Sequence, residues 1–134
     1  LGGVLHDIGK LGTPDNILNK PGKLDEQEWE IIRMHPVVGN QICLPLKESL
    51  GEALSIVRQH HEKLDGSGYP DGLVADEIGL VARILAVVDI YDALVTDRAY
   101  RKGMNQERAI NILQEEADAG KLDGEVLKQF LTLL

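Results

Sequence analysis

The sequence predicts an all-α domain, a helical bundle, and three observations support this. Apolar side chains recur at helical spacing along most of the chain, with little of the alternation that strands show. Capping residues, glycine or proline lie at the ends of several of these segments. Residues 78–96 are apolar nearly all round, which is typical of a central buried helix. At 134 residues the chain has the size of one domain and can bury a core.

The amino-terminal part is expected to be a helix end followed by a loop. Residues 1–8 have the pattern of the last turns of a helix, which Gly9 would close. Residues 12–24 are predicted to be a loop with one short helical turn, with Thr13 as its cap and Pro14 as its first helical residue. Because the sequence opens in mid-helix without a methionine, we expect at least one helix upstream of it.

The next helix is predicted over residues 24–35, and its start is well defined. Asp25 can cap it, and Glu28, three residues later, completes a capping box. Pro36 should end or kink this helix, because proline lacks the backbone N–H that the helix needs. His35 would then lie at the break.

Two further helices and a loop are expected in the middle of the chain. Residues 37–46 form a short helix that stops near Pro45. Residues 52–62 have the apolar spacing of an amphipathic helix, and two adjacent histidines lie at its end. Residues 63–73 contain several glycines and are predicted to be a loop.

The carboxyl-terminal part is predicted to be helical. The long apolar helix of residues 78–96 is followed by amphipathic helices near residues 106–117 and 124–133. Gly120 is expected to end the first of these two, and Asp123 to cap the second. We find no internal repeat and no linker, so the whole chain is interpreted as one domain.

Composition narrows the classes of partner. A net charge of −8 argues against long nucleic acid, which requires a basic surface. The lone Cys43 excludes a disulfide within the chain and favours a reducing, cytoplasmic location. No apolar run has the roughly 20 residues that a membrane-spanning helix needs. Arg98, Arg101 and Lys102 nevertheless form a basic cluster, which could bind a small anion.

Asp89 is an unusual residue, because it lies within the apolar helix of residues 78–96. An ionised carboxylate buried there costs several kcal/mol unless a cation meets it. It is therefore either a hydrogen-bonded helix aspartate or a metal ligand. Asp92, one turn later, is more consistent with a structural hydrogen bond.

The histidines carry weak signals singly and a stronger one together. The pair His6 and Asp7 is a common dipeptide, and a histidine before proline, such as His35, is usually a loop or cap residue. The adjacent His60 and His61 point about 100° apart if they are helical. Both can serve one site only if it is wide, as a cluster of metal ions roughly 3.5–4 Å apart would be.

Taken as a set, these residues predict a metal centre. All four histidines in the chain lie at helix ends or breaks, and imidazole with carboxylate suits manganese, iron or zinc. Lys10 lies one turn from His6 and Asp7, where its ammonium could hold an anionic oxygen. This pattern is consistent with a multi-metal hydrolase.

Four motifs in order resemble those of one known family. They are HDIGK at residues 6–10, the pair His35-Pro36, HHEKLDGSGYP at residues 60–70, and ILAVVDIYDALVTDRAYR at residues 84–101. Each is modest evidence, but together and at this spacing they resemble an HD-GYP domain of the HD phosphohydrolase superfamily. The similarity extends along the whole chain.

The resemblance implies a bacterial phosphodiesterase that hydrolyses the second messenger cyclic di-GMP to linear pGpG or GMP. It implies two or three divalent ions, iron or manganese more often than zinc. Asp7 would bridge the ions, and Lys10 would contact the scissile phosphate. Carried over by motif, the expected metal ligands are His6, Asp7, His35, His60, His61 and Asp89.

The resemblance also implies substrate contacts. Gly68 and Tyr69 would lie on a loop facing the nucleotide, and Arg98 and Arg101 would meet the second phosphate or a guanine edge. Where the family has Arg-Pro-Tyr, this chain has Arg98-Ala99-Tyr100, and the upstream helix that carries further family ligands is absent. An upstream receiver or sensor domain is expected. The alternatives are a non-catalytic nucleotide-sensing or protein-interaction module, and a phosphohydrolase for another nucleotide.

Overall fold

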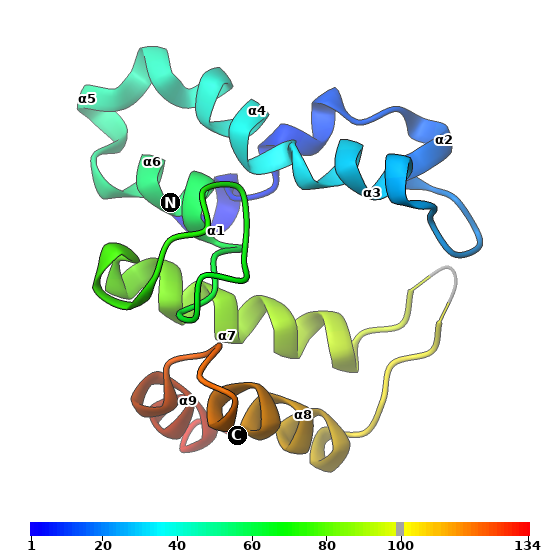
Figure 1. Cartoon of the computed structure of the whole chain (residues 1–134), viewed down its shortest axis with the longest axis vertical. Coiled ribbons are helices and arrows are strands. Elements are labelled where there is room, and N and C mark those ends of the chain that lie inside the picture. The colour runs from blue at the N-terminus through cyan, green and yellow to red at the C-terminus, as the bar shows by residue number, and fades with distance from the viewer. Residues whose placement is uncertain (99–100) are drawn as a thin grey trace.

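The computed structural model describes residues 1–98 and 101–134, and it confirms the all-α class (Figure 1). Over these residues, β-pairing is limited to two isolated bridges. None of the helices in the described ranges is long and apolar enough to cross a membrane. The α-helices are α1 (Gly2–Leu5), α2 (Asp15–Leu18), α3 (Glu26–Arg33), α4 (His35–Cys43), α5 (Lys47–Leu50), α6 (Glu52–Gln59), α7 (Leu80–Val95), α8 (Gln106–Asp118) and α9 (Gly124–Leu131). The short 3₁₀ helices are η1 (Ile8–Gly12), η2 (Leu44–Leu46) and η3 (Ala75–Glu77).

The helices form two groups that meet along α7. In the amino-terminal group, α4 packs against η1 and α6, and α6 packs against α1. In the carboxyl-terminal group, α7, α8 and α9 pack against one another. Figure 1 shows α7 running between the two groups, with α8 and α9 below it. The contact between α6 and α7 joins them.

The local signals around α3 are confirmed, whereas those around α2 are not. Asp25 and Glu28 form the predicted capping box. The break falls at Met34, one residue before the position expected for it, because His35 and Pro36 belong to the first turn of α4 and Pro36 does not end α3. Thr13 is not the cap of α2, because its backbone N–H donates to the carbonyl of Lys10 and so closes η1. Pro14 has extended backbone angles and is itself the cap, so α2 begins one residue later than predicted.

The helix predicted over residues 52–62 is shorter than expected, because α6 ends at Gln59. His60 is its last, half-helical residue, and Glu62 closes a turn by donating its backbone N–H to the carbonyl of Gln59. The two histidines therefore leave the helix axis, which lets both reach the interior.

The central helix α7 is buried on one side only. Val87 is fully buried with Leu113 of α8 and Leu127 of α9, and these residues form the main core. The prediction of a helix buried all round was wrong on the opposite side, where four apolar side chains remain 39–61% exposed: Leu80, Val81, Ile84 and Val88. Apolar composition alone does not distinguish a face that is covered from one that is left open.

A close backbone approach positions the amino-terminal motif. A Cβ atom at Gly9 would collide with the backbone carbonyl of His35. Gly39, one turn further along α4, also lies against the backbone of Gly9. Because glycine alone permits this contact, η1 can lie directly on α4 and hold Asp7 beside His35.

We predict that Gly9→Ala lowers the free energy of unfolding by about 1–3 kcal/mol, because the backbone must move to admit the methyl group. Gly3→Ala is the matched control, since a Cβ at Gly3 meets nothing within 4 Å. It should be neutral or stabilising by up to about 1 kcal/mol, because alanine favours the helix. Urea denaturation measures both. Equal stability of Gly9→Ala and the wild type would contradict this packing.

Candidate metal centre

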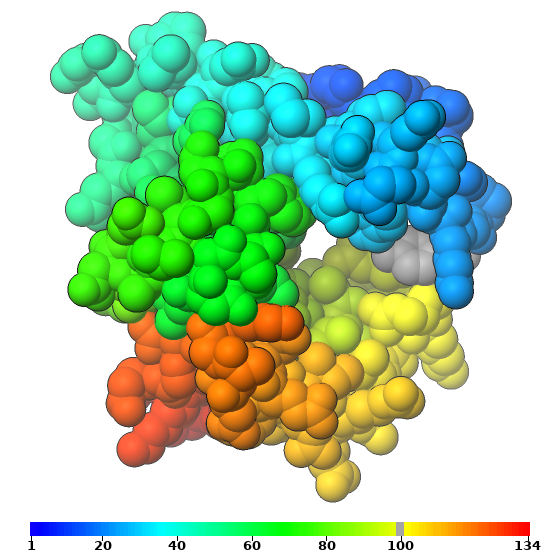
Figure 2. All heavy atoms as spheres, in the orientation of Figure 1, coloured from blue at the N-terminus to red at the C-terminus, as the bar shows by residue number. Residues whose placement is uncertain are grey.

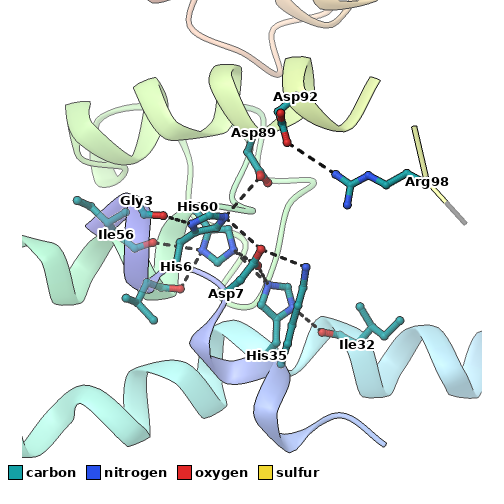
Figure 3. Close-up of polar contacts among 12 residues, drawn as sticks. Gly3, His6, Asp7, Ile32, His35, Ile56, His60, Asp89, Asp92 and Arg98 are labelled. Carbon is teal, nitrogen blue, oxygen red and sulfur yellow. Dashed lines mark hydrogen bonds and ion pairs between the residues drawn. The ribbon is translucent and has the colours of Figure 1, made fainter. Parts of the chain in front are cut away.

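His6, Asp7 and Asp89 meet at the junction of the two helix groups (Figure 3). His6 Nε2 lies 3.2 Å from Asp7 Oδ2 and 3.5 Å from Asp89 Oδ1. Its other nitrogen, Nδ1, lies 2.6 Å from the carbonyl of Gly3. A carbonyl only accepts, so Nδ1 carries the proton and Nε2 faces the two carboxylates.

His35 and His60 are held in the same way. His35 Nδ1 donates to the carbonyl of Ile32 at 2.7 Å, and His60 Nδ1 donates to the carbonyl of Val57 at 2.9 Å. These bonds fix the ring orientation and leave each Nε2 atom as a lone-pair donor when the ring is neutral. Both rings are buried, so water does not satisfy them.

The Nε2 atoms of these two rings converge. They lie 3.1 Å apart, and they are 3.3 Å and 3.8 Å from Asp7 Oδ1 for His35 and His60 respectively. Lone pairs directed at one point repel unless a cation lies among them. Donors bound to one ion at about 2.1 Å are about 3.0–3.5 Å apart, so most of these separations match the edges of a coordination shell.

His61 and Tyr69 complete this side of the cluster. One ligand atom each from Asp7, His35, His60 and His61 lies within 4.8 Å of every other. The ring of His61 stacks on that of Tyr69, with centroids 4.9 Å apart. Burial, and to a lesser extent the electrostatic effect of the neighbouring His60 and His35, lowers the pKa of His61 to about 3. This ring is therefore neutral near pH 7 and available as a ligand.

The carboxylates stay ionised. Burial alone would raise the pKa of Asp7, but contacts with His35, His6 and His60 outweigh it and hold that pKa far below its usual range. The pKa of Asp89 is lowered, mainly by His6. Asp7 and then Asp89 raise the pKa of His6 to about 10, so a positive charge is strongly favoured between the two carboxylates.

These observations fit a divalent metal site. Asp7 Oδ1 and His6 Nε2 are buried and have no hydrogen-bond partner, a costly condition that a metal ion would relieve. The donors are imidazole nitrogens and carboxylate oxygens, which suit manganese, iron or zinc. The structure thus brings together all six residues that the motifs predict as ligands.

The Gly-Tyr-Pro loop lies over this cluster because two local features fix it. A Cβ atom at Gly68 would collide with the backbone of residues 61–63, so only glycine permits the loop to fold back there. Glu62 is 3% exposed, and its carboxylate accepts hydrogen bonds from the backbone N–H groups of Asp71 and Leu73, at 2.6 and 2.9 Å. The sequence analysis missed this role of Glu62. A charged residue directly before a glycine-rich loop was the available signal.

The predicted cationic residues lie in different settings. Lys10 Nζ is 3.1 Å from Asp7 Oδ2, at the edge of the cluster. Arg98 is partly exposed and 3.9 Å from Asp92. Arg101 instead donates to the carbonyls of Ala93 and Leu94 at the carboxyl end of α7. Ala99 and Tyr100, the remainder of the predicted Arg-Ala-Tyr motif, lie outside the described residues.

A cavity of about 550 Å³ opens above the cluster. Its lining includes His60, His61 and Asp89 from the cluster, and Gly68 and Tyr69 from the loop. Burial raises the pKa of Tyr69 to about 12, so its phenol keeps its proton and can donate a hydrogen bond. The arrangement can therefore receive a ligand between metal ligands and loop.

Comparison with known proteins agrees with this geometry. A sequence profile of the HD domain family matches residues 1–126. A cyclic di-GMP phosphodiesterase of Pseudomonas aeruginosa is 44% identical over 98% of this chain and 31% of its own length. A 3′3′-cGAMP-specific phosphodiesterase of Vibrio cholerae is 45% identical over 98% of this chain and 29% of its own. A cyclic di-GMP phosphodiesterase response regulator of Xanthomonas campestris is 41% identical over 88% and 31% respectively.

The chain therefore belongs to the HD domain family, and the resemblance to HD-GYP domains is confirmed. It spans about a third of the length of the curated relatives it matches.

We predict that Glu62→Gln lowers the free energy of unfolding by about 1–3 kcal/mol. The amide NH₂ group would face one of the two backbone N–H donors, and a donor cannot accept that hydrogen bond. Glu115→Gln, on the exposed side of α8, makes the same change where the side chain has no hydrogen bond or ion pair within the described residues, and it should cost less than about 0.5 kcal/mol. Chemical denaturation compares the two. A Glu62→Gln protein as stable as Glu115→Gln would show that this carboxylate does not hold the loop.

Proposed function

We propose that this HD domain hydrolyses cyclic di-GMP to linear pGpG, and onward to GMP, with two or three divalent ions. One observation carries the proposal: six nitrogen- and oxygen-bearing ligand residues converge beneath the Gly-Tyr-Pro loop and line or adjoin a cavity. The curated relatives named above include phosphodiesterases for cyclic di-GMP, which supports this substrate.

Asp7 is the residue that would bridge the ions. Its Oδ1 atom faces His35 and His60, whereas its Oδ2 atom faces His6 at 3.2 Å. One carboxylate thus borders two donor groups, one of which includes Asp89 and the other His61. The adjacent His60 and His61 both belong to the group at Oδ1, together with His35.

Bound divalent ions would supply Lewis acidity and a water of lowered pKa. The chain's own residues would do the rest. Lys10, held at the edge of the cluster by Asp7, would offset negative charge that develops on the phosphoryl oxygens. The buried rings of His35 and His60, locked by their Nδ1 bonds, would keep the donor set rigid during turnover.

The Gly-Tyr-Pro loop would close the site over the nucleotide. Tyr69 is braced by its stack on His61, and its protonated phenol would be a hydrogen-bond donor to substrate. Gly68 would allow the substrate to approach the backbone. Arg98 would meet the second phosphate or a guanine edge. For Arg101, whose guanidinium is engaged at the end of α7, the same contact would require it to leave the carbonyls of Ala93 and Leu94.

A second cyclic dinucleotide is a specific alternative substrate. The relative named as specific for 3′3′-cGAMP is as similar to this chain as the cyclic di-GMP enzyme is. A panel of cyclic di-GMP, 3′3′-cGAMP and simple phosphodiesters decides between them by kcat/KM. Binding of a cyclic dinucleotide without product would instead indicate a non-catalytic sensing module.

The wider setting belongs to the same proposal. Iron or manganese is favoured over zinc by the family resemblance. The relative named as a response regulator supports an upstream receiver domain as regulatory partner. A cytoplasmic bacterial location is consistent with the lone, buried Cys43, and the acidic net charge still argues against long nucleic acid.

We predict that His61→Ala loses part of the bound metal and all measurable hydrolysis of cyclic di-GMP, because one ion loses a ligand. Chromatography of nucleotide products and elemental analysis measure the two effects. Asn111→Ala, an exposed polar change on α8, is the control and should behave as the wild type. Full turnover by His61→Ala would refute the ligand assignment.

We predict that Lys10→Gln lowers kcat about 100-fold while the metal content stays the same, because the lost charge acts on the transition state. Lys10→Arg should recover part of the rate. Lys128→Gln makes the same charge change on the exposed surface of α9 and should leave kcat unchanged. The proposed role of Lys10 is wrong if Lys10→Gln and Lys128→Gln turn over equally fast.

A further inference from the structure

A second cavity, of about 590 Å³, adjoins the metal cluster, and among the described residues that line it only Lys10 and Arg98 belong to the family motifs. Lys10 belongs to its lining and reaches Asp7 at 3.1 Å, which connects the cavity to the cluster. The loop between α2 and α3, helix α3 itself and Arg98 form the other walls. Figure 2 shows an opening between the green loop that follows α6 and the blue-to-cyan segment of α3 and α4, with the yellow-green α7 behind it.

The lining of this cavity is positive in a chain whose net charge is −8. Four cationic side chains line it, and no acidic one does among the described residues: Lys10, Lys20, Lys23 and Arg98. Glu28 pairs with Lys20 at 2.7 Å and neutralises it. Lys23 has no ion pair within the described part of the chain, and Arg98 has only the long 3.9 Å contact with Asp92. Lys23 and Arg98 thus remain available to an anion.

The same cavity contains an exposed aromatic ring. Trp29, the only tryptophan of the chain, is 43% exposed and lines the cavity. The guanidinium of Arg33 lies 5.8 Å from its ring centroid, and Arg33 also lines the first cavity beside Tyr69. Nearly half of this large aromatic surface is therefore open to a ligand. An exposed ring beside cations is the arrangement that binds nucleobases and phosphates together.

We propose that this second cavity binds the distal half of the dinucleotide, with its base stacked on Trp29 and its phosphate held by Lys23 and Arg98. The inference rests on the proposed function, because a cyclic dinucleotide presents a second base and phosphate when the first phosphate is at Lys10. The two cavities flank the cluster, so each takes one nucleotide. Trp29 and Lys23 then determine specificity for dinucleotides over simple phosphodiesters.

The first test uses the fluorescence of Trp29 in the full chain loaded with Mn²⁺. Because no other tryptophan contributes, cyclic di-GMP binding should quench its emission in a saturable way. Lys23→Gln should weaken the binding measured by this quench about 5-fold or more, whereas Lys128→Gln, the same change on α9, should not alter it. Saturable binding in calorimetry with no change in Trp29 emission would overturn the proposal.

The second test separates the cavity from the metal cluster. In Trp29→Leu, kcat/KM for cyclic di-GMP divided by that for bis(p-nitrophenyl) phosphate should fall about 10-fold, within the range that base stacking supplies. The loss should appear mainly as a higher KM. The manganese content and melting temperature of Trp29→Leu should equal those of the wild type. Trp29→Phe should recover part of it, because phenylalanine also stacks. An unchanged ratio in Trp29→Leu would overturn the proposal.

The outcomes also separate this inference from the proposed function. If the wild type binds cyclic di-GMP without cleaving it, the proposed function fails. Calorimetry of Trp29→Leu then decides the inference, since about 10-fold weaker binding supports the subsite and equal binding overturns it. If the wild type cleaves bis(p-nitrophenyl) phosphate but neither binds nor cleaves any cyclic dinucleotide, both fail.

Discussion

The structure depends on one repeated interaction, the hydrogen bond from an imidazole Nδ1 atom to a backbone carbonyl. His6, His35 and His60 each make it, and each therefore directs Nε2 at the carboxylates of the cluster or at another ring. Two ionised carboxylates and three inward-facing Nε2 atoms in a largely buried space are unfavourable by themselves. The helix packing holds these groups together, and a cation bound among them would remove the unfavourable contacts.

The ends of the helices explain where these rings lie. His6 follows the end of α1, His35 follows the end of α3, and His60 ends α6, so each ring is next to a carbonyl in the last turn of a helix. The close contact between Gly9 and His35 brings two of these ends together. Asp89 comes from the middle of α7 and is the contribution of the second helix group. The complete cluster therefore requires both helix groups to be in place.

Sequence predicted what local chemistry determines. The capping residues Asp25 and Asp123 were identified from spacing alone, and the helical class followed from periodicity. The six candidate ligands were implied by the resemblance of the motifs to those of HD-GYP domains. Glu62, the cavity at Trp29 and the open side of α7 were missed, since each depends on contacts between segments distant in sequence. The contacts of Arg101 were missed for the same reason, because the motif does not reveal that its guanidinium binds carbonyls at the end of α7.

The most direct test of the central claim is the metal content per chain, measured by elemental analysis of protein purified without chelator and without oxygen. The account predicts two or more iron or manganese ions in the wild type. It predicts fewer in His60→Ala, because this change removes the His60 Nε2 atom, which faces His35 and Asp7 in the cluster. Protein with no bound metal, or the same content in both proteins, would contradict it.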